Sequence, residues 1–155
     1  MANKTLIAAA GEHYVAYALS CLGFTAALVR QGAPSIDILA STLDGGRTIG
    51  IQVKTTEWAE RTRGRGEEKK PFELQFPLGH RAIEQASPNT VVCFVDLRGL
   101  DFNEQPNVYV VTTRTLIEQY RGKDIRQYSY FRYHRPIEEM DKFKNNWQPI
   151  IEALS

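Results

Sequence analysis

Two segments in which apolar and polar residues alternate flank a short run of aspartate and glycine, and this arrangement constrains the fold more than any other feature. Residues 35–43 and 48–55 both follow the two-residue period of a half-buried strand. Residues 44–46 read Asp-Gly-Gly, and both Asp-Gly and Gly-Gly are strong signals for a tight turn. The sequence therefore predicts an antiparallel hairpin.

The length of the turn decides which residues of the hairpin face each other. A two-residue turn at residues 44–45 places Asp37 opposite Gln52, and a turn at residues 45–46 places Asp37 opposite Lys54. In both cases Asp37, Gln52 and Lys54 lie on one face of the hairpin. A three-residue loop would shift the pairing by one residue and separate them.

An amphipathic helix is predicted ahead of the hairpin, over residues 4–22, and Gly23 follows as a residue that ends helices. Its apolar stripe holds one carboxylate, Glu12, among Ala8, Val15, Leu19 and Leu22. A carboxylate on a helix face that packs against a sheet needs a cation, a metal ion or hydrogen-bond donors. We therefore expect Glu12 to face the site formed by Asp37 and Lys54.

Strand-like and helix-like segments alternate in the rest of the chain. Residues 57–71 are polar, charged and glycine-containing, so they are predicted to form a mobile loop. Further strands are predicted at 24–29, 72–76, 90–97 and 108–113, and further helices at 79–86, 114–120 and 137–154, the last of them up to or around Pro149. This order predicts an α/β fold with a mixed central sheet flanked by helices.

Length and composition bound the class of protein. A chain of 155 residues suffices for one substantial core, so a single domain over residues 1–155 is predicted. Hydrophobic residues at 43% and charged residues at 24% are typical of soluble globular proteins. Residues 1–10 are too short for a secretory leader or a membrane span, so a cytoplasmic protein without membrane association is expected. No cysteine or histidine spacing indicates a zinc site.

The residues on the helix and hairpin resemble a known set. Glu12 on a helix, Asp37 on the next strand but one, and Gln52-Val53-Lys54 on its hairpin partner resemble the PD-(D/E)XK nuclease superfamily, in particular its Holliday-junction-resolvase-like members and bacterial families with a Gln-x-Lys motif. The resemblance covers residues 8–55 and implies a restriction-endonuclease-like αβββαβ core. Ile36 stands where the motif has proline, and Gln52 replaces the usual acidic residue, which removes one negative charge from the metal site.

The resemblance implies a role for each residue of the set. Asp37 would be the main ligand of Mg²⁺, or of Mn²⁺ as a substitute, with the Gln52 side-chain oxygen and the Val53 backbone carbonyl as weaker ligands. Lys54 would hold or help deprotonate the attacking water and offset charge on the phosphate. Glu12 would bind a second ion or orient a metal-bound water. No small-molecule cofactor is implied.

Basic residues suggest where a nucleic acid could bind. Net charge is only +1, but positive residues gather in two segments. Arg61, Arg63 and Arg65 belong to the predicted loop, where glutamates dilute them, so a solvated loop is an equal alternative. Arg126 and Arg132 belong to residues 125–135, which interleave aromatic and basic residues as single-strand binding surfaces do. A strand with its aromatics in the core is the favoured alternative there.

The resemblance therefore implies a divalent-metal-dependent endonuclease that hydrolyses DNA phosphodiester bonds. The alternative is a non-catalytic nucleic-acid-binding or protein-interaction module that retains the nuclease fold, as Gln52 suggests. One chain offers one active site, so cleavage of both DNA strands in one event would need a symmetric dimer, and a homodimer is expected.

Overall fold

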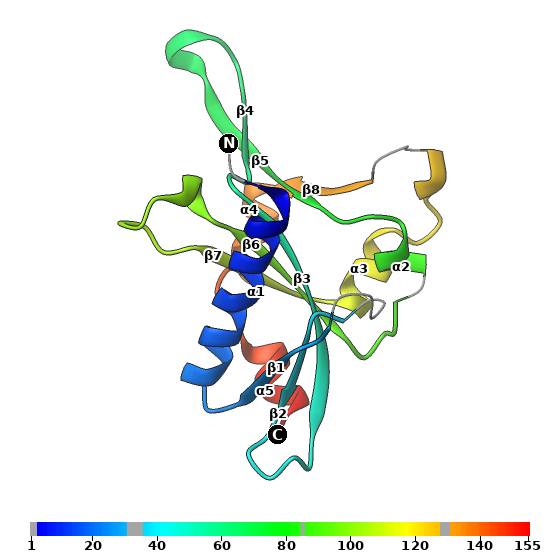
Figure 1. Cartoon of the computed structure of the whole chain (residues 1–155). Coiled ribbons are helices and arrows are strands. Elements are labelled where there is room, and N and C mark those ends of the chain that lie inside the picture. Colours follow the sequence, from blue (N-terminus) through cyan, green and yellow to red (C-terminus); the bar gives the residue numbers. More distant parts are fainter. Residues whose placement is uncertain (1–2, 31–35, 85, 128–130) are drawn as a thin grey trace.

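The computed structural model describes residues 3–30, 36–84, 86–127 and 131–155. Within these residues two β-sheets pack together, a mixed sheet of order β1-β2-β3-β6-β7 and an antiparallel sheet of order β4-β5-β8. In Figure 1 the helix α1 lies along the mixed sheet, and the β4–β5 hairpin projects well beyond the rest of the molecule. The two sheets meet where β3 runs into β4.

Helix α1 spans Lys4–Cys21, close to its predicted bounds. The Asn3 side chain caps it by accepting a hydrogen bond from the Thr5 N–H at 2.8 Å, and Gly23 follows with a φ of +92°. Its buried residues are Gly11, Val15 and Leu19. The predicted stripe was therefore partly wrong: Ala8 and Leu22 are exposed, because the helix is rotated so that Gly11 approaches the sheet.

Strands β1 (Thr25–Leu28), β2 (Ile38–Ser41) and β3 (Thr48–Thr56) form an antiparallel run. Ile38 faces Ile51 and Ser41 faces Thr48, which is the register predicted for a turn at residues 44–45. The first residue of the predicted strand 35–43 lies outside the described residues. The turn itself is wider than predicted: the Thr42 N–H donates to the Arg47 carbonyl across it.

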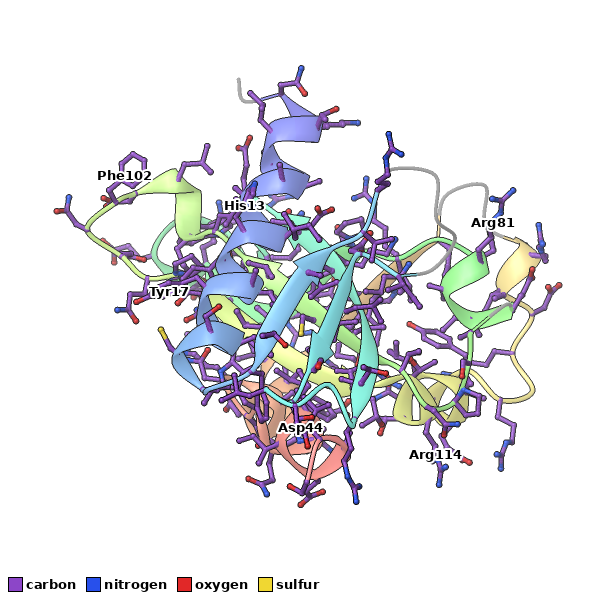
Figure 2. All side chains as sticks on the ribbon, turned by 60° about the horizontal axis from the view of Figure 1, so that its bottom comes forward. His13, Tyr17, Asp44, Arg81, Phe102 and Arg114 are labelled. Atoms are coloured by element: carbon purple, nitrogen blue, oxygen red, sulfur yellow. The ribbon has the colours of Figure 1, made fainter. Side chains whose placement is uncertain are left out.

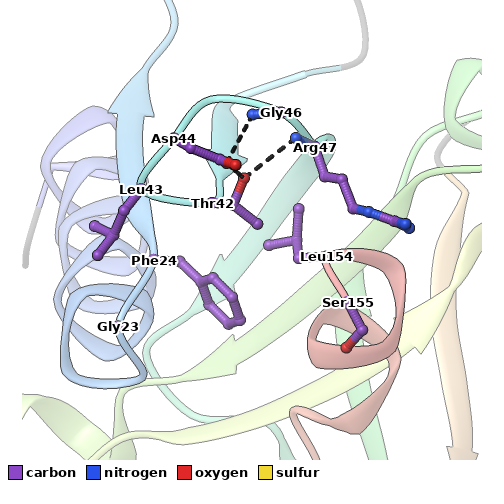
Figure 3. A pocket seen from close by; sticks show the side chains of 9 residues that line it. All are labelled: Gly23, Phe24, Thr42, Leu43, Asp44, Gly46, Arg47, Leu154 and Ser155. Atoms are coloured by element: carbon purple, nitrogen blue, oxygen red, sulfur yellow. Dashed lines mark hydrogen bonds between the residues drawn. The ribbon is translucent and has the colours of Figure 1, made fainter.

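Side chains stabilise this turn (Figure 3). The Thr42 hydroxyl donates to Asp44 Oδ1 at 2.6 Å, the Gly46 N–H donates to the same oxygen at 2.9 Å, and the Arg47 N–H donates to Thr42 Oγ1 at 3.2 Å. Gly45 has a φ of +72°, a conformation that glycine adopts without strain. These contacts fix the hairpin register.

Strand β6 (Val91–Asp96) pairs parallel to β3, and β7 (Asn107–Thr112) pairs antiparallel to β6. The parallel pairing requires a crossover, which contains the short helix α2 (Arg81–Glu84) and the 3₁₀ turn η1 (Gly66–Glu68). The order α1-β1-β2-β3-α2-β6, with β4 and β5 inserted after β3, confirms the predicted αβββαβ core with a mixed central sheet flanked by helices.

The prediction of a loop over residues 57–71 was wrong. Strand β4 (Glu60–Arg63) pairs with β5 (Lys70–Pro77), and β5 pairs with β8 (Arg132–Pro136). The outer part of the β4–β5 hairpin reaches away from the core, so both of its faces meet solvent and carry polar side chains (Figure 1). A strand of that kind lacks the alternation by which strands are detected.

Apolar side chains pack on both faces of the mixed sheet. One core joins α1 and the C-terminal helix to the sheet through Val15, Leu19, Ile51 and Ile150. The other joins β5 and β8 to the opposite face through residues that include Phe76, Phe94 and Tyr133. In that core the rings of Phe94 and Tyr133 stack with centroids 4.5 Å apart. Tyr133 of β8 and the preceding Phe131 therefore belong to the core, as the favoured alternative for residues 125–135 predicted, although residues 128–130 lie outside the described part.

The C-terminal segment is not the continuous helix predicted for residues 137–154. It is divided into α4 (Ile137–Met140), the 3₁₀ turn η4 (Asp141–Phe143) and α5 (Gln148–Ala153). Asn145, at a φ of +51°, breaks the helix and donates its N–H to the Val108 carbonyl at 2.6 Å. Pro149 lies in the first turn of α5, where proline is tolerated, rather than at a helix end.

The remaining elements connect these layers. Helix α3 (Thr113–Gln119) follows β7, the 3₁₀ turn η2 (Arg98–Leu100) follows β6, and the 3₁₀ turn η3 (Ile125–Gln127) precedes β8. In Figure 2, Phe102 lies at the end of the β6–β7 loop, on the opposite side of the molecule from Arg81 and Arg114. Across the described ranges, none of the helices combines the length and apolar composition needed to cross a bilayer.

Candidate active site

A cleft of about 810 Å³ opens where α1, the end of β3 and the second sheet meet. Its walls contain three of the four predicted catalytic residues, Glu12, Asp37 and Lys54, together with the Val53 backbone. The other lining residues are Lys4, Ile7, Ala8, Thr55, Thr56, Glu57, Trp58, Arg61, Gln75, Phe76, Pro77 and Arg132. The cleft is the place where the helix and the hairpin bring distant parts of the sequence together.

The Asp37 carboxylate is held against the backbone of β3. Its Oδ2 accepts a hydrogen bond from the Val53 N–H at 2.7 Å, and the Asp37 N–H donates to the Ile51 carbonyl at 2.9 Å. In an extended strand the N–H and the carbonyl of one residue point to the same side. The Val53 carbonyl therefore points toward the side of β3 on which Asp37 lies.

Glu12 is half-buried on α1, beside the buried stripe rather than within it. Burial raises the pKa of Glu12, the negative charge of Asp37 raises it further, and His13 opposes both by lowering it. The two carboxylates are therefore close enough to repel each other. A cation between them would relieve this repulsion.

Lys54 lies near the end of β3, half-buried, and lines the cleft. Burial lowers the pKa of Lys54, and the Asp37 carboxylate partly opposes this effect. Asp37 thus interacts electrostatically with both Glu12 and Lys54. An amine whose pKa lies below its ordinary value loses its proton more easily than an exposed lysine does.

Gln52 is not one of the residues that line the cleft. Strand alternation places its side chain on the face of β3 that also carries Lys54, opposite the buried Ile51 and Val53. Nearby on this face, the Ile36 side chain covers Gly50, where an added Cβ would lie 2.9 Å from Ile36 Cδ1. The predicted ligand role of Gln52 therefore gains no support from its position.

The oxygen donors of the cleft suit a hard divalent cation. Mg²⁺ is commonly bound by one or two carboxylates, with water and substrate phosphate completing its octahedral shell. Glu12 and Asp37 supply two carboxylates, and the Val53 carbonyl can supply a neutral oxygen. Over the described residues no group of three or more histidine, cysteine, aspartate or glutamate side chains is placed to hold a metal ion. The set fits a water-rich Mg²⁺ site and not a closed structural one.

The predicted nucleic-acid-binding arginines separate into two groups. Arg61 and Arg132 line the cleft. On the β4–β5 hairpin, Arg63 Cζ lies 5.2 Å from the centroid of the Phe72 ring, and Arg65 is exposed near the hairpin end. Arg126 instead forms an ion pair with Glu84 of α2. The structure therefore brings two of the five together with the predicted catalytic residues.

Two features of the cleft were missed from the sequence. The first is Gln75, which contacts both cleft arginines; a polar residue between the apolar Leu74 and Phe76 was the available signal. The second is the close contact of Gly11 with β3, where an added Cβ would lie 1.8 Å from Thr55 Oγ1. This contact lets α1 approach the sheet and sets the position of the adjacent Glu12.

A second hollow, of about 560 Å³, lies between the β2–β3 turn and the C-terminus (Figure 3). Its carboxylate, Asp44, is used by the turn: the hydrogen bond from the Thr42 hydroxyl, and next that from the Gly46 N–H, lower the pKa of Asp44. Phe24 and Leu154 form its apolar part. The polar residues that line this hollow stabilise the hairpin turn, and we assign them no catalytic role.

No family model and no curated protein matches this sequence. Among solved structures, one of a bacterial homing endonuclease, I-Ssp6803I, is similar with a TM-score of 0.62. The similarity covers 99% of this chain and 95% of that one, at 12% sequence identity. At such low identity the similarity concerns the fold. The chain thus shares the fold of a bacterial homing endonuclease over nearly its whole length.

Proposed function

We propose that this protein is a divalent-metal-dependent DNA endonuclease of the PD-(D/E)XK type. The observation that carries the proposal is the cleft itself, in which Asp37 is bonded to the Val53 backbone and acts electrostatically on both Glu12 and Lys54. The fold shared with a homing endonuclease supports it. Neither the helix nor the hairpin alone would form this arrangement.

Each of these cleft residues would have a different role in phosphodiester hydrolysis. A bound Mg²⁺ or Mn²⁺ would act as a Lewis acid on the phosphate and would acidify water. Asp37 and the Val53 carbonyl would hold the ion, and Glu12 would bind it from α1 or orient a water. Lys54 would orient the attacking water and, in its protonated form, stabilise negative charge that develops on the phosphate. Gln52 is left without an assigned step.

The direct test is cleavage of duplex and branched DNA in the presence of Mg²⁺ or Mn²⁺. Wild type is expected to cleave, and Lys54→Ala and Asp37→Asn are expected to lose activity. Glu138→Gln is the matched control, because it removes an exposed carboxylate of α4 that lies outside the cleft lining. Equal inactivity of wild type and Lys54→Ala on every substrate would refute catalysis.

A second candidate function is non-catalytic binding of a nucleic acid or a protein on the same fold. Gln52 favours it, because a neutral amide replaces the expected carboxylate and lies outside the cleft lining. This candidate predicts binding that Asp37→Asn leaves unchanged and no thermal shift with divalent ions. The cleavage assay and a Mn²⁺ titration followed by melting temperature together separate the two.

The homodimer and the cytoplasmic location stay predictions. Concerted cleavage of both strands needs two active sites, and sedimentation of the protein with and without duplex DNA would give the oligomeric state.

A further inference from the structure

The second sheet contributes two positive charges to the cleft, and one amide oxygen joins them. Arg61 belongs to β4 and Arg132 to β8, the two strands on either side of β5. Gln75 Oε1 on β5 accepts a hydrogen bond from Arg61 Nε at 3.3 Å and from Arg132 Nη1 at 3.0 Å. All three residues line the cleft. We call this set the Arg61–Gln75–Arg132 bridge.

Strand alternation explains why these side chains meet. Leu74 and Phe76 of β5 are buried in the core against the mixed sheet, so Gln75 between them points to the other face. Arg132 is paired with Pro77, which shares the face of Gln75. The bridge is therefore built on a sheet whose opposite face is anchored in the core.

Arg61 is fixed in orientation before any ligand arrives. Its Nη1 donates to the backbone carbonyls of Trp58 at 2.9 Å and Glu60 at 3.1 Å, in addition to the bond from Nε to Gln75. Across the described ranges its hydrogen bonds go to neutral oxygen atoms, whereas Arg98 and Arg126 bond to carboxylates. Its charge is thus held in place by neutral acceptors.

The side chain at position 75 is a neutral amide, and this neutrality affects how strongly the two arginines attract an anion. A glutamate here would also hold both guanidinium groups, but it would cancel part of their charge. An amide holds them without adding a negative charge of its own. Guanidinium groups suit phosphate oxygens, because their planar N–H donors can bond two oxygens at once.

The bridge forms a group of charges distinct from the candidate catalytic residues. The charged groups that shift the pKa of Glu12 are Asp37 and His13, and the one that shifts the pKa of Lys54 is Asp37. Neither arginine is among them. One cleft therefore holds an acidic set beside α1 and the mixed sheet, suited to a metal ion, and a basic pair on the second sheet, suited to a phosphate.

We propose that the Arg61–Gln75–Arg132 bridge binds one phosphate of the DNA strand, and so fixes the position of the strand in the cleft. The proposal rests on the proposed function for its ligand, DNA. Arg61 and Arg132 bind the phosphate, and Gln75 is a positioning residue.

Binding of a fluorescent duplex of about 20 base pairs, measured in a chelator over a range of salt concentrations, tests the proposal without cleavage. Loss of one phosphate contact lowers the slope of log affinity against log salt by about one. The Arg61→Gln/Arg132→Gln double variant is expected to show this loss and to bind about tenfold more weakly. Arg114→Gln, an exposed charge on α3, is the matched control. A slope equal to that of the control overturns the proposal. A slope lowered by about two overturns the claim that both arginines bind the same phosphate.

A second variant guards against a change in folding. Gln75→Glu keeps the size of the side chain and its hydrogen bonds, so its melting temperature is expected to stay within about 2 °C of wild type. Its DNA affinity is nevertheless expected to fall as far as that of the double variant, because the carboxylate competes with phosphate. Wild-type affinity in Gln75→Glu overturns the role of the bridge.

The two proposals fail in different ways. Loss of the phosphate contact in the double variant, together with an inert wild type in the cleavage assay, would retain the bridge and refute catalysis. Cleavage by wild type, together with unchanged DNA binding by the double variant, would retain catalysis and refute the bridge. A duplex of RNA is measured in parallel, and an effect confined to RNA overturns the assignment to DNA.

Discussion

The Asp37 carboxylate accepts a hydrogen bond from the Val53 N–H at 2.7 Å, across the hairpin that the Asp-Gly-Gly turn closes. This bond ties the predicted metal ligand to the strand that also carries Lys54. It gives Asp37 a structural role besides the catalytic role proposed above. The two roles can be separated, because an asparagine oxygen can accept the same hydrogen bond without carrying a charge.

Asp37→Asn is therefore expected to fold and to lose cleavage. Loss of about 3 kcal/mol of metal-dependent stabilisation of the transition state corresponds to a cleavage rate lowered by about 100-fold or more. Single-turnover cleavage measures the rate, and thermal melting checks the fold. A rate within about threefold of wild type would mean that Asp37 is not a metal ligand.

Glu12→Gln is expected to raise the melting temperature in the absence of metal. The native pKa of Glu12 lies above its unfolded value, chiefly through burial and secondarily through Asp37, so stability falls as the pH rises through the native pKa. The difference between Glu12→Gln and wild type should thus appear at neutral pH and vanish below the unfolded pKa. The same variant should bind Mn²⁺ about 10–100-fold more weakly, a value typical of weakened metal sites. A gain in stability that persists in acid would show that charge is not its cause.

Lys54→Met is expected to stabilise the protein by roughly 2–4 °C at pH 7 while abolishing cleavage. Burial lowers the native pKa of Lys54 below its unfolded value. Between these two values the unfolded chain binds more protons, so wild-type stability rises with pH across this window. The advantage of Lys54→Met should therefore shrink in alkaline buffer. Melting curves from pH 7 to 11 test this, and Lys142→Met, outside the cleft lining, is the control.

Gly11→Ala is expected to destabilise the protein by about 1–3 kcal/mol, because the new Cβ would overlap Thr55. Alanine favours a helix over glycine, so a net loss would be evidence for the clash itself. Thr55→Ala on the same chain removes Thr55 Oγ1 and should recover part of the loss. Urea unfolding of the three variants measures the coupling. Additive effects of the two substitutions would contradict direct contact.

The hairpin and its register could be predicted because Asp44-Gly45-Gly46 and the alternation of Ile49, Ile51 and Val53 are local signals. That register brings Asp37 to the strand that carries Gln52 and Lys54, but the hydrogen bond from the Val53 N–H to the Asp37 carboxylate was not predicted. The position of Glu12 was only partly predictable: periodicity identified the helix, but the rotation of α1 depends on the fit of Gly11 against Thr55, which are far apart in sequence.

The second sheet could not be predicted for a related reason. Strand β4 has the sequence Glu-Arg-Thr-Arg, and its projecting hairpin lacks a buried face that would impose alternation. It pairs with β5, which pairs in turn with β8, and Arg132 of β8 lies 71 positions after Arg61 in the chain. The bridge through Gln75 thus results from tertiary structure alone.

The insertion of β4 and β5 after β3 divides the cleft between separate stretches of the gene. Glu12, Asp37, Val53 and Lys54 all come from the first 54 residues of the chain, whereas the arginines that line the same cleft come from the insertion and from β8. Substrate preference could therefore diverge through exchange of the hairpin while the reaction centre is retained. Under the proposed function, a chimera carrying the hairpin of a nuclease of this fold would inherit a new way of holding DNA without a new way of cutting it.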